Sequence, residues 1–523
     1  MADTTPELKK VTLDKDLDKI VHVEAAVSTV SRGLAGPGLG LLFLILAAVF
    51  AAVYVAGEPR ALIIILAAAI GAYMALNIGA NDVANNVGPA VGSRALTLGG
   101  ALIIAAIFES AGALIAGGDV VSTISKGIID PASVASPDTF IWAMMAALIS
   151  SALWVNLATW IGAPVSTTHS VVGGVMGAGI AAAGFASVNW TTMSAIAASW
   201  VISPLLGGVI AALFLGFIKS FIIYQDDKIA AARRWVPVLI AIMAGAFAAY
   251  LAMKGLKKII KLDGLAILLI GATVGIASWA VTHPLIGKQA EGLENRNQSL
   301  RQLFHLPLIC SAALLSFAHG ANDVANAVGP LAAIVHTAEA GEFATKVSIP
   351  IWVMVIGALG ISVGLVLFGP KLIRMVGEQI TKLNPMRAYC VALSAAITVI
   401  IASRLGLPVS STHIAVGAVF GVGFFREWYT ANSKRRREYI GRKLERARNI
   451  KLEPAESAET MADSVALHTT RTVPNGGNGI EAKRRKLVRR AHFTTIVAAW
   501  VITVPAAAIM AGVIFTALNA LTS

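Results

Sequence analysis

The chain has 523 residues and a formal net charge of +13, yet only 14% of its residues are charged and 56% are hydrophobic. Soluble domains carry about 25% charged residues, so this composition excludes an ordinary soluble protein and predicts a polytopic membrane protein. The two cysteines, Cys310 and Cys390, both lie in apolar runs and exclude a disulfide framework or a cysteine-based metal site.

Apolar runs long enough to cross a bilayer begin after a polar N-terminal segment, residues 1–35, which does not have the pattern of a signal peptide. A first transmembrane repeat is predicted over residues 36–220. Its spans are expected at about 39–57, 60–78, 96–117, 140–161 and 193–217. A glycine-rich run at 171–180 predicts a further short or re-entrant helix packed inside the protein.

The remaining chain divides into three further parts. Residues 221–304 are predicted to hold two connecting spans, at about 235–253 and 265–282, and a charged loop. A second transmembrane repeat is expected over 305–424 and is completed by a last span within 492–523. The fold prediction is therefore an all-α membrane protein with roughly 10–12 membrane segments.

A basic insert, residues 425–491, interrupts the second repeat. It holds 17 Lys and Arg against 8 Asp and Glu, which is +9 of the net charge. In a membrane protein such a segment predicts a cytoplasmic location and contact with anionic lipid, rather than binding of nucleic acid. Regulation and disorder are the alternatives for this insert.

Three sequence motifs recur in the same order in both halves. G-A-N-D-V-A-N occupies 79–85 and 320–326, P-V-S-[TS]-T-H occupies 164–169 and 408–413, and A-[AS]-W-V-I-[ST] occupies 198–203 and 498–503. Repeats whose hydrophobic segments are interrupted at matching positions indicate a secondary transporter, with its binding site where the interruptions meet. We expect the repeats to be inverted. An odd number of membrane crossings between the two copies would produce this inversion.

The first motif places an aspartate, Asp82, where hydropathy expects a buried helix. A carboxylate within the membrane is costly and marks a functional site by default. Asp82 and Asn85 are three residues apart and Asn81 and Asn85 are four apart, so the members of each pair share a helix face. Amide and carboxylate oxygens suit a hard cation such as Na⁺. The alternative is a structural network that ties two helices together. We also expect that a regular helix does not continue easily through Gly88-Pro89.

The second motif places a cluster of hydroxyls directly before an apolar run. Serine and proline are typical of a helix start, and a helix start binds oxyanions through its free N–H groups. Two such starts facing each other could surround a tetrahedral oxyanion. Alternatively, the hydroxyls bond to carbonyls of their own helix. His169 and His413 follow the clusters and could be ligands, proton carriers or core residues.

Glu109 is a single acid in the third span. We set F-E-S-A-G, residues 108–112, against I-G-A-L-G, residues 356–360, which has no acid. Glu109 is therefore a candidate for cation coupling without a partner in the second half, and structural pairing with a polar neighbour is the alternative.

A cation beside the aspartates would remove their repulsion of a bound anion, which is a physical reason for symport.

The doubled motifs resemble the inorganic phosphate transporter (PiT) family over about residues 60–220 and 305–520. The resemblance implies cation-coupled import of inorganic phosphate by alternating access, through two inverted repeats in a homodimer of the plasma (inner) membrane. It implies Na⁺ or H⁺ as the coupling cation and no other cofactor. It implies that phosphate is held by Ser166, Thr167, Thr168, Ser410, Ser411 and Thr412. It implies that the cations are held by Asn81, Asp82, Asn85, Asn322, Asp323 and Asn326.

Other functions remain open at this point. Another tetrahedral oxyanion such as sulfate is the nearest alternative substrate, because hydroxyl donors do not identify the central atom. An anion channel is a weaker alternative, since carboxylates in an anion path make sense only with coupled cations. An enzyme is not expected, because the adjacent hydroxyls and histidines do not face each other on a helix.

Overall fold

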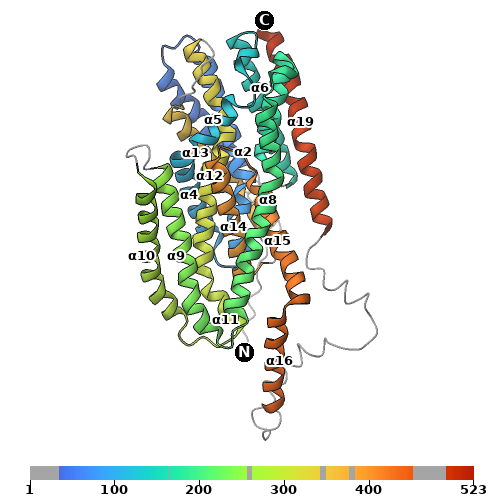
Figure 1. Ribbon diagram of the computed structural model, residues 1–523. Helices are drawn as coiled ribbons and strands as arrows, with labels where there is room; N and C mark the ends of the chain where they lie inside the picture. Colours follow the sequence, from blue (N-terminus) through green and yellow to red (C-terminus); the bar gives the residue numbers. More distant parts are fainter. Residues whose placement is uncertain are drawn as a thin grey trace, which may run out of the picture.

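The computed structural model describes residues 34–163, 165–255, 262–341, 349–375, 383–450 and 490–522. These residues are almost entirely helical and contain no β-ladder beyond one isolated bridge between Ile129 and Val188. Among them, 11 helices are long and apolar enough to cross a membrane. The prediction of an all-α polytopic membrane protein is therefore confirmed (Figure 1).

The helices follow the predicted order with shifted ends. Those of the first half are Leu34–Val55, α2 (Ala61–Asn81), α3 (Val83–Gly92), α4 (Leu98–Ala116), α5 (Gly118–Lys126), α6 (Pro137–Ile161), α7 (Thr167–Ala183) and α8 (Trp190–Ile218). The connecting pair is α9 (Lys228–Lys254) and α10 (Gly264–Gln289). The later helices are α11 (Asn297–Leu303), α12 (His305–Ala340), α13 (Ile351–Met375), α14 (Pro385–Arg404), α15 (Ser411–Asn432), α16 (Lys434–Ile450) and α19 (Arg490–Thr522).

Several predicted segments fall partly outside the described residues. These are residues 1–33 of the polar N-terminal segment, the proline of the first P-V-S-T-T-H motif, and residues 451–489 of the basic insert. The described start of that insert is helical, because α15 extends to Asn432 and α16 follows it. The short helix predicted in the glycine-rich run is present as α7, with 17 residues.

The interruption expected at Gly88-Pro89 is not found, because the helix continues through both residues. After α2 ends at Asn81, the chain stays in helical geometry through Asp82, and α3 continues past Pro89 to Gly92. In the second half, α12 runs without a break through both Asp323 and Pro330. A proline removes one backbone hydrogen bond, but a buried helix tolerates that loss when its neighbours hold both arms in place. The irregularity lies at Asp82 instead, whose carbonyl accepts from the N–H of Asn85 rather than Asn86.

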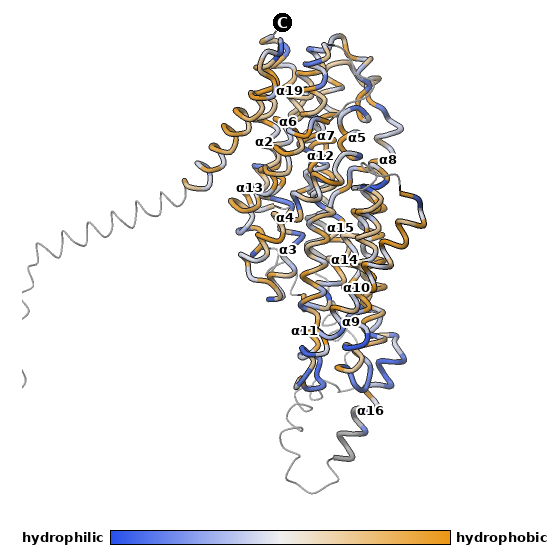
Figure 2. The backbone as a smooth tube through the Cα atoms, turned by 90° about the vertical axis from the view of Figure 1, so that its left-hand side faces the viewer, coloured by the Kyte–Doolittle hydropathy of each residue, from blue (hydrophilic) through white to orange (hydrophobic). Residues whose placement is uncertain are grey.

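The two halves interlock. In the inner layer, α2 packs on α13 and α12 packs on α4, so each motif helix lies against a helix of the other half. The α6–α7 hairpin is covered by α19, and the α14–α15 hairpin is covered by α8. Figure 2 places the first hairpin toward one end of the molecule and the second toward the other, with α12 alongside. Neither half could therefore complete its own packing alone.

Close crossings of the inner helices reveal how the halves correspond. A Cβ atom on Gly320 would overlap the carbonyl oxygen of Glu109, and one on Gly79 would overlap that of Ile361. The Ser110 and Ser362 hydroxyls meet at 2.7 Å between these crossings. The counterpart of Glu109 is therefore Ile361, and G-I-S-V-G, residues 360–364, stands against F-E-S-A-G. Our alignment with residues 356–360 was wrong by one helical turn, because small residues recur in this helix every three or four positions.

We expect Gly320→Ala to destabilise the fold by about 2 kcal/mol, because a methyl group there must push α12 away from the backbone of α4. Thermal unfolding of the purified protein in detergent measures the effect. Gly99→Ala is the matched control, since a Cβ atom at Gly99 meets nothing within 4 Å. Equal unfolding midpoints for the two variants would contradict the close crossing.

Candidate functional site

The two predicted hydroxyl clusters begin helices and meet in the interior. Ser166 caps α7, with its Oγ accepting from the N–H of His169 at 3.1 Å, and Ser410 caps α15 in the same way at 3.3 Å. Both clusters are buried. Thr168 Oγ1 donates to the carbonyl of Val409 at 3.0 Å, so one helix start touches the loop before the other. The start of α7 is therefore in contact with the loop that leads into α15.

Each aspartate accepts hydrogen bonds from these hydroxyls. Asp82 accepts from Thr167 at 2.6 Å and, across the halves, from Thr412 at 3.1 Å. Asp323 accepts from Ser411 at 3.1 Å. Both carboxylates are 1% exposed, so these donors replace water that cannot reach them. The carboxylate and hydroxyl motifs thus form one site rather than two.

Two asparagines join each half to the hydroxyl cluster of the other. Asn85 Nδ2 donates to Thr412 Oγ1 at 2.9 Å. Its counterpart Asn326 donates to Thr168 Oγ1 at 3.1 Å and to Thr167 Oγ1 at 3.2 Å. The hydroxyls that face the site are therefore held by both halves at once, so a relative motion of the halves would change their hydrogen bonding.

Asn81 and Asn322 belong to the same motif as Asn85 and Asn326 but have different hydrogen-bond partners. Asn81 Nδ2 donates to Thr159 Oγ1 and to the Ala163 carbonyl, and its Oδ1 accepts from the N–H of Val165. Asn322 makes the same three bonds in the second half, to Ser403 Oγ, the Leu407 carbonyl and the N–H of Val409. Both side chains therefore fix the loop that delivers a hydroxyl cluster. Their amide oxygens are already engaged, unlike that of Asn326.

A histidine that we did not single out lies at the centre of the site. His319 Nδ1 is 2.6 Å from Glu109 Oε2, and His319 Nε2 is 2.7 Å from Asp323 Oδ2. Glu109 Oε1 accepts from Asn86 Nδ2 at 2.8 Å. The signal in the sequence was the spacing of four residues between His319 and Asp323, which puts them on one helix face. Glu109 thus has a polar partner in His319, and His319 in turn contacts Asp323 of the predicted cation motif.

Carboxylates from both halves gather around this histidine. Side-chain oxygens of Asp82 and Asp323 and a ring nitrogen of His319 all lie within 4.8 Å of one another. Several carboxylates in an interior without water repel one another unless protons or cations are bound among them. Among the buried side-chain oxygens of the described residues that have no hydrogen-bond partner, three belong to amides or carboxylates: Asn86 Oδ1, Asp323 Oδ1 and Asn326 Oδ1. Such oxygens are the ligands that hard cations prefer.

The histidines of the second motif lie between the two hairpins. The rings of His169 and His413 have centroids 4.4 Å apart, and Trp200 stacks on His169 at 3.7 Å. The Trp200 Nε1–H donates to the Pro408 carbonyl at 3.1 Å. His169 Nδ1 lies 2.7 Å from Ser166 Oγ. The hydrogen bond from Trp200 therefore joins the tryptophan of the third motif in one half to the hairpin loop of the other.

A buried site of hydroxyls, amides and carboxylates, enclosed by two helical hairpins in an all-helical membrane protein, defines a membrane transport protein. The model of a family described as "Phosphate transporter family" matches residues 78–511. The chain belongs to this family, which consists of transporters rather than enzymes.

Individual relatives agree with this assignment. A Helicobacter pylori protein named "Putative phosphate permease" is 47% identical over 527 residues, covering 96% of this chain and 99% of the relative. A Pyrococcus furiosus permease of the same description is 35% identical over 461 residues, covering 88% and 97%. The solved structure titled "The sodium-dependent phosphate transporter" superposes with a TM-score of 0.73 at 33% identity, covering 88% of this chain and all of that one.

Proposed function

We propose that this protein imports inorganic phosphate by cation symport with alternating access, and that Na⁺ is the coupling cation. The observation that carries the proposal is the bond from Thr167 Oγ1 to Asp82 Oδ2, at 2.6 Å. A hydroxyl assigned to phosphate and a carboxylate assigned to the cation are in direct contact. The two ligands would therefore bind next to each other.

This contact suggests why the two ligands would bind together. Thr167, Ser411 and Thr412 donate their protons to carboxylates. To hold a phosphate, those hydroxyls must turn their protons toward it, and the aspartates then lose their donors. A buried carboxylate without donors is strongly disfavoured, so a cation must take their place. Each ligand then raises the affinity for the other by the same factor, which is the thermodynamic basis of symport.

The two helix starts supply the rest of the phosphate site in this proposal. The first turns of α7 and α15 present backbone N–H groups and the positive ends of two helix dipoles. The six hydroxyls Ser166, Thr167, Thr168, Ser410, Ser411 and Thr412 add neutral donors. Because Ser166 and Ser410 also cap their helices, they would fix the geometry of the site. The threonines and Ser411 would exchange their hydrogen-bond partners.

Na⁺ is favoured as the cation by two observations. The side-chain oxygens of Asn86, Asp323 and Asn326 that have no hydrogen-bond partner among the described residues are suited to a hard cation. The structural relative at 33% identity is named as sodium-dependent. In this assignment Asp82, Asp323, Asn85 and Asn326 contact or adjoin the cation, whereas Asn81 and Asn322 shape the loops around it.

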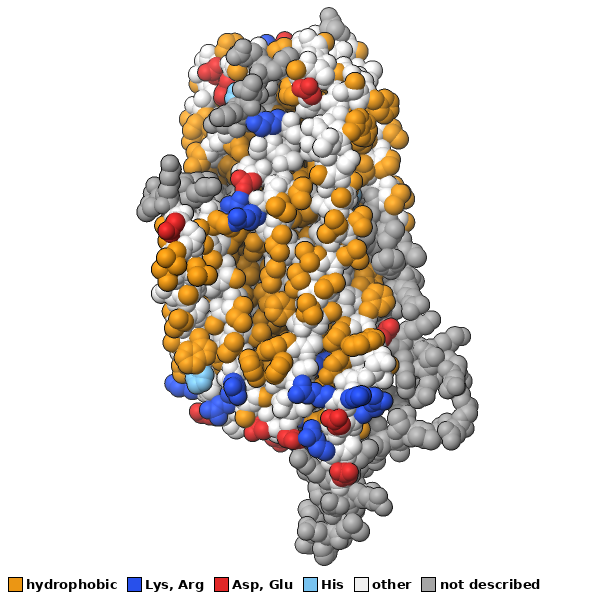
Figure 3. All heavy atoms as spheres, in the orientation of Figure 1, with side chains coloured by type: hydrophobic (Ala, Val, Ile, Leu, Met, Phe, Trp, Pro, Cys, Tyr) orange, Lys and Arg blue, Asp and Glu red, His pale blue; other side chains and the backbone are white. Residues whose placement is uncertain are grey.

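The arrangement of the halves is also part of the proposal. The hairpins α6–α7 and α14–α15 lie toward opposite ends, as inverted repeats require (Figure 2). Basic side chains gather near the end of the molecule where α16 begins (Figure 3), so the positive-inside rule assigns this end and the basic insert to the cytoplasm. We propose that the protein works in the plasma membrane as a homodimer.

Uptake of radiolabelled phosphate into proteoliposomes tests the function. We expect uphill accumulation when a Na⁺ gradient is imposed at equal pH on both sides, and none when K⁺ replaces Na⁺. Accumulation driven only by a pH gradient would replace Na⁺ by H⁺. Uphill uptake that needs neither gradient would contradict symport, and sulfate competing as well as phosphate would contradict the substrate.

A further inference from the structure

A pocket lies between α9 and α10, on the helix pair outside the two repeats (Figure 1). It has a volume of about 420 Å³ and is lined by Ala230, Arg233, Arg234, Val238, Trp279 and His283. Arg233 and Arg234 come just before the apolar part of α9, and Trp279 and His283 come near the end of α10. The pocket therefore sits where the apolar part of this pair gives way to charged residues, which is the level of lipid headgroups.

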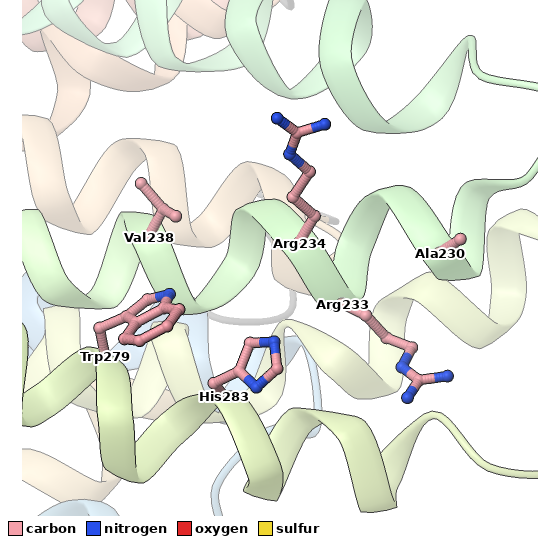
Figure 4. Close-up of a pocket in the computed structure, with 6 residues that line it drawn as sticks. All are labelled: Ala230, Arg233, Arg234, Val238, Trp279 and His283. Atoms are coloured by element: carbon pink, nitrogen blue, oxygen red, sulfur yellow. The ribbon is translucent and has the colours of Figure 1, made fainter.

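The pocket is positively charged. Arg233 and Arg234 are exposed, and neither contacts a carboxylate within the described ranges. Figure 4 shows the two arginines leaving α9 in different directions, with Trp279 and His283 on the facing helix. The rings of Trp279 and His283 are 5.3 Å apart. Guanidinium groups that have no acid partner, beside an indole, form a site for a phosphate group at a membrane surface.

The surroundings of the pocket distinguish a lipid phosphate from a free one. Only 6% of the most apolar stretch of α10 is buried in the protein, so this helix is exposed on the surface of the chain along most of its length. Leu268, Ile276 and Val281 are all more than 60% exposed. A ligand held at the arginines can therefore lay an apolar chain along α10. Inorganic phosphate would gain nothing from that surface.

We propose that this pocket binds the headgroup of an anionic phospholipid, with the flexible side chains of Arg233 and Arg234 turning toward its phosphate and its acyl chains along α10. The basic band in Figure 3 lies at the same end of the molecule, which positive-inside topology assigns to the cytoplasmic leaflet. Anionic lipids give that leaflet its negative surface potential, so the ligand is present where the pocket is. The lipid would fill a gap in a helix pair that packs on the transport core through α9 and α12.

Lipid retention tests the proposal. The protein is reconstituted into vesicles of equimolar phosphatidylglycerol and phosphatidylcholine and extracted with mild detergent, and bound lipids are counted by native mass spectrometry. The test variant is Arg233→Gln/Arg234→Gln. The control variant, Lys288→Gln/Arg301→Gln, removes the same charge from exposed residues outside the pocket. Thermal unfolding of each variant establishes that it is folded.

We expect the test variant to lose the preference for phosphatidylglycerol about 30-fold and the control to keep it, because each of the two basic side chains near anionic lipid contributes on the order of 1 kcal/mol. Adding inorganic phosphate should not release the bound lipid. An equal loss in both variants would show general attraction to charge and overturn the proposal. Release by inorganic phosphate, or no preference in the unaltered protein, would overturn it as well.

Discussion

Replacing Asp82 by asparagine is expected to lower Na⁺-driven phosphate uptake by about 100-fold or more while the protein remains folded. Asparagine has nearly the same shape, and its Oδ1 can still accept from Thr167 or Thr412. What it lacks is the charge that would attract and hold the cation. Without that cation, the hydroxyls of the site have no reason to leave their present partners for phosphate.

The measurement is initial uptake in proteoliposomes as a function of Na⁺ concentration. Asp138→Asn is the matched control, because Asp138 is a half-exposed aspartate paired with Arg60 at an end of the protein. Exposed ion pairs contribute little, so this control should transport within about twofold of the unaltered protein. Full Na⁺-driven uptake by Asp82→Asn would remove this carboxylate from the coupling mechanism.

Replacing either Glu109 or His319 alone by isoleucine is expected to lower the stability of the protein strongly. Replacing both together is expected to lower it less. The equivalent positions of the other crossing, Ile361 and Ile78, are already both isoleucine and fully buried. Glu109→Ile alone leaves His319 Nδ1 and Asn86 Nδ2 without their shared carboxylate partner. His319→Ile alone leaves Glu109 with Asn86 as its only donor among the described residues. Each single change should cost about 3 kcal/mol, because it strands a buried polar or charged group.

The double variant Glu109→Ile/His319→Ile removes both members and copies an apolar pair that the same fold already accommodates. We expect it to recover most of the stability lost in the single variants, which a double-mutant cycle of unfolding midpoints measures. Half-maximal phosphate uptake by the double variant should require a Na⁺ concentration several-fold different from that of the unaltered protein, since Asp323 would lose the ring nitrogen 2.7 Å from Oδ2. Additive losses in the cycle would show that Glu109 and His319 are not coupled, and an unchanged Na⁺ dependence would show that the pair does not position Asp323.

The local predictions from sequence succeeded where the signal is local. Apolar length identified the spans, and capping residues placed the starts of α7 and α15 at the hydroxyl clusters. The prediction at Gly88-Pro89 was wrong, because a propensity rule for one residue was applied where packing on all sides decides the outcome. The alignment of Glu109 was wrong because alanine and glycine recur throughout both helices, and only the two crossings at Gly320 and Gly79 set the register.

The sequence by itself determined the class of protein, the two repeats and most of the polar residues that meet in the interior. It could do so because a polar motif in an apolar span is conspicuous and its repetition is countable. Tertiary structure alone decided the partners: His319 meets Glu109 across 210 residues, and Asn85 meets Thr412 across 327. Those contacts depend on which helices cross and at which residue, and that is set by the interlocking of the two halves rather than by any local pattern.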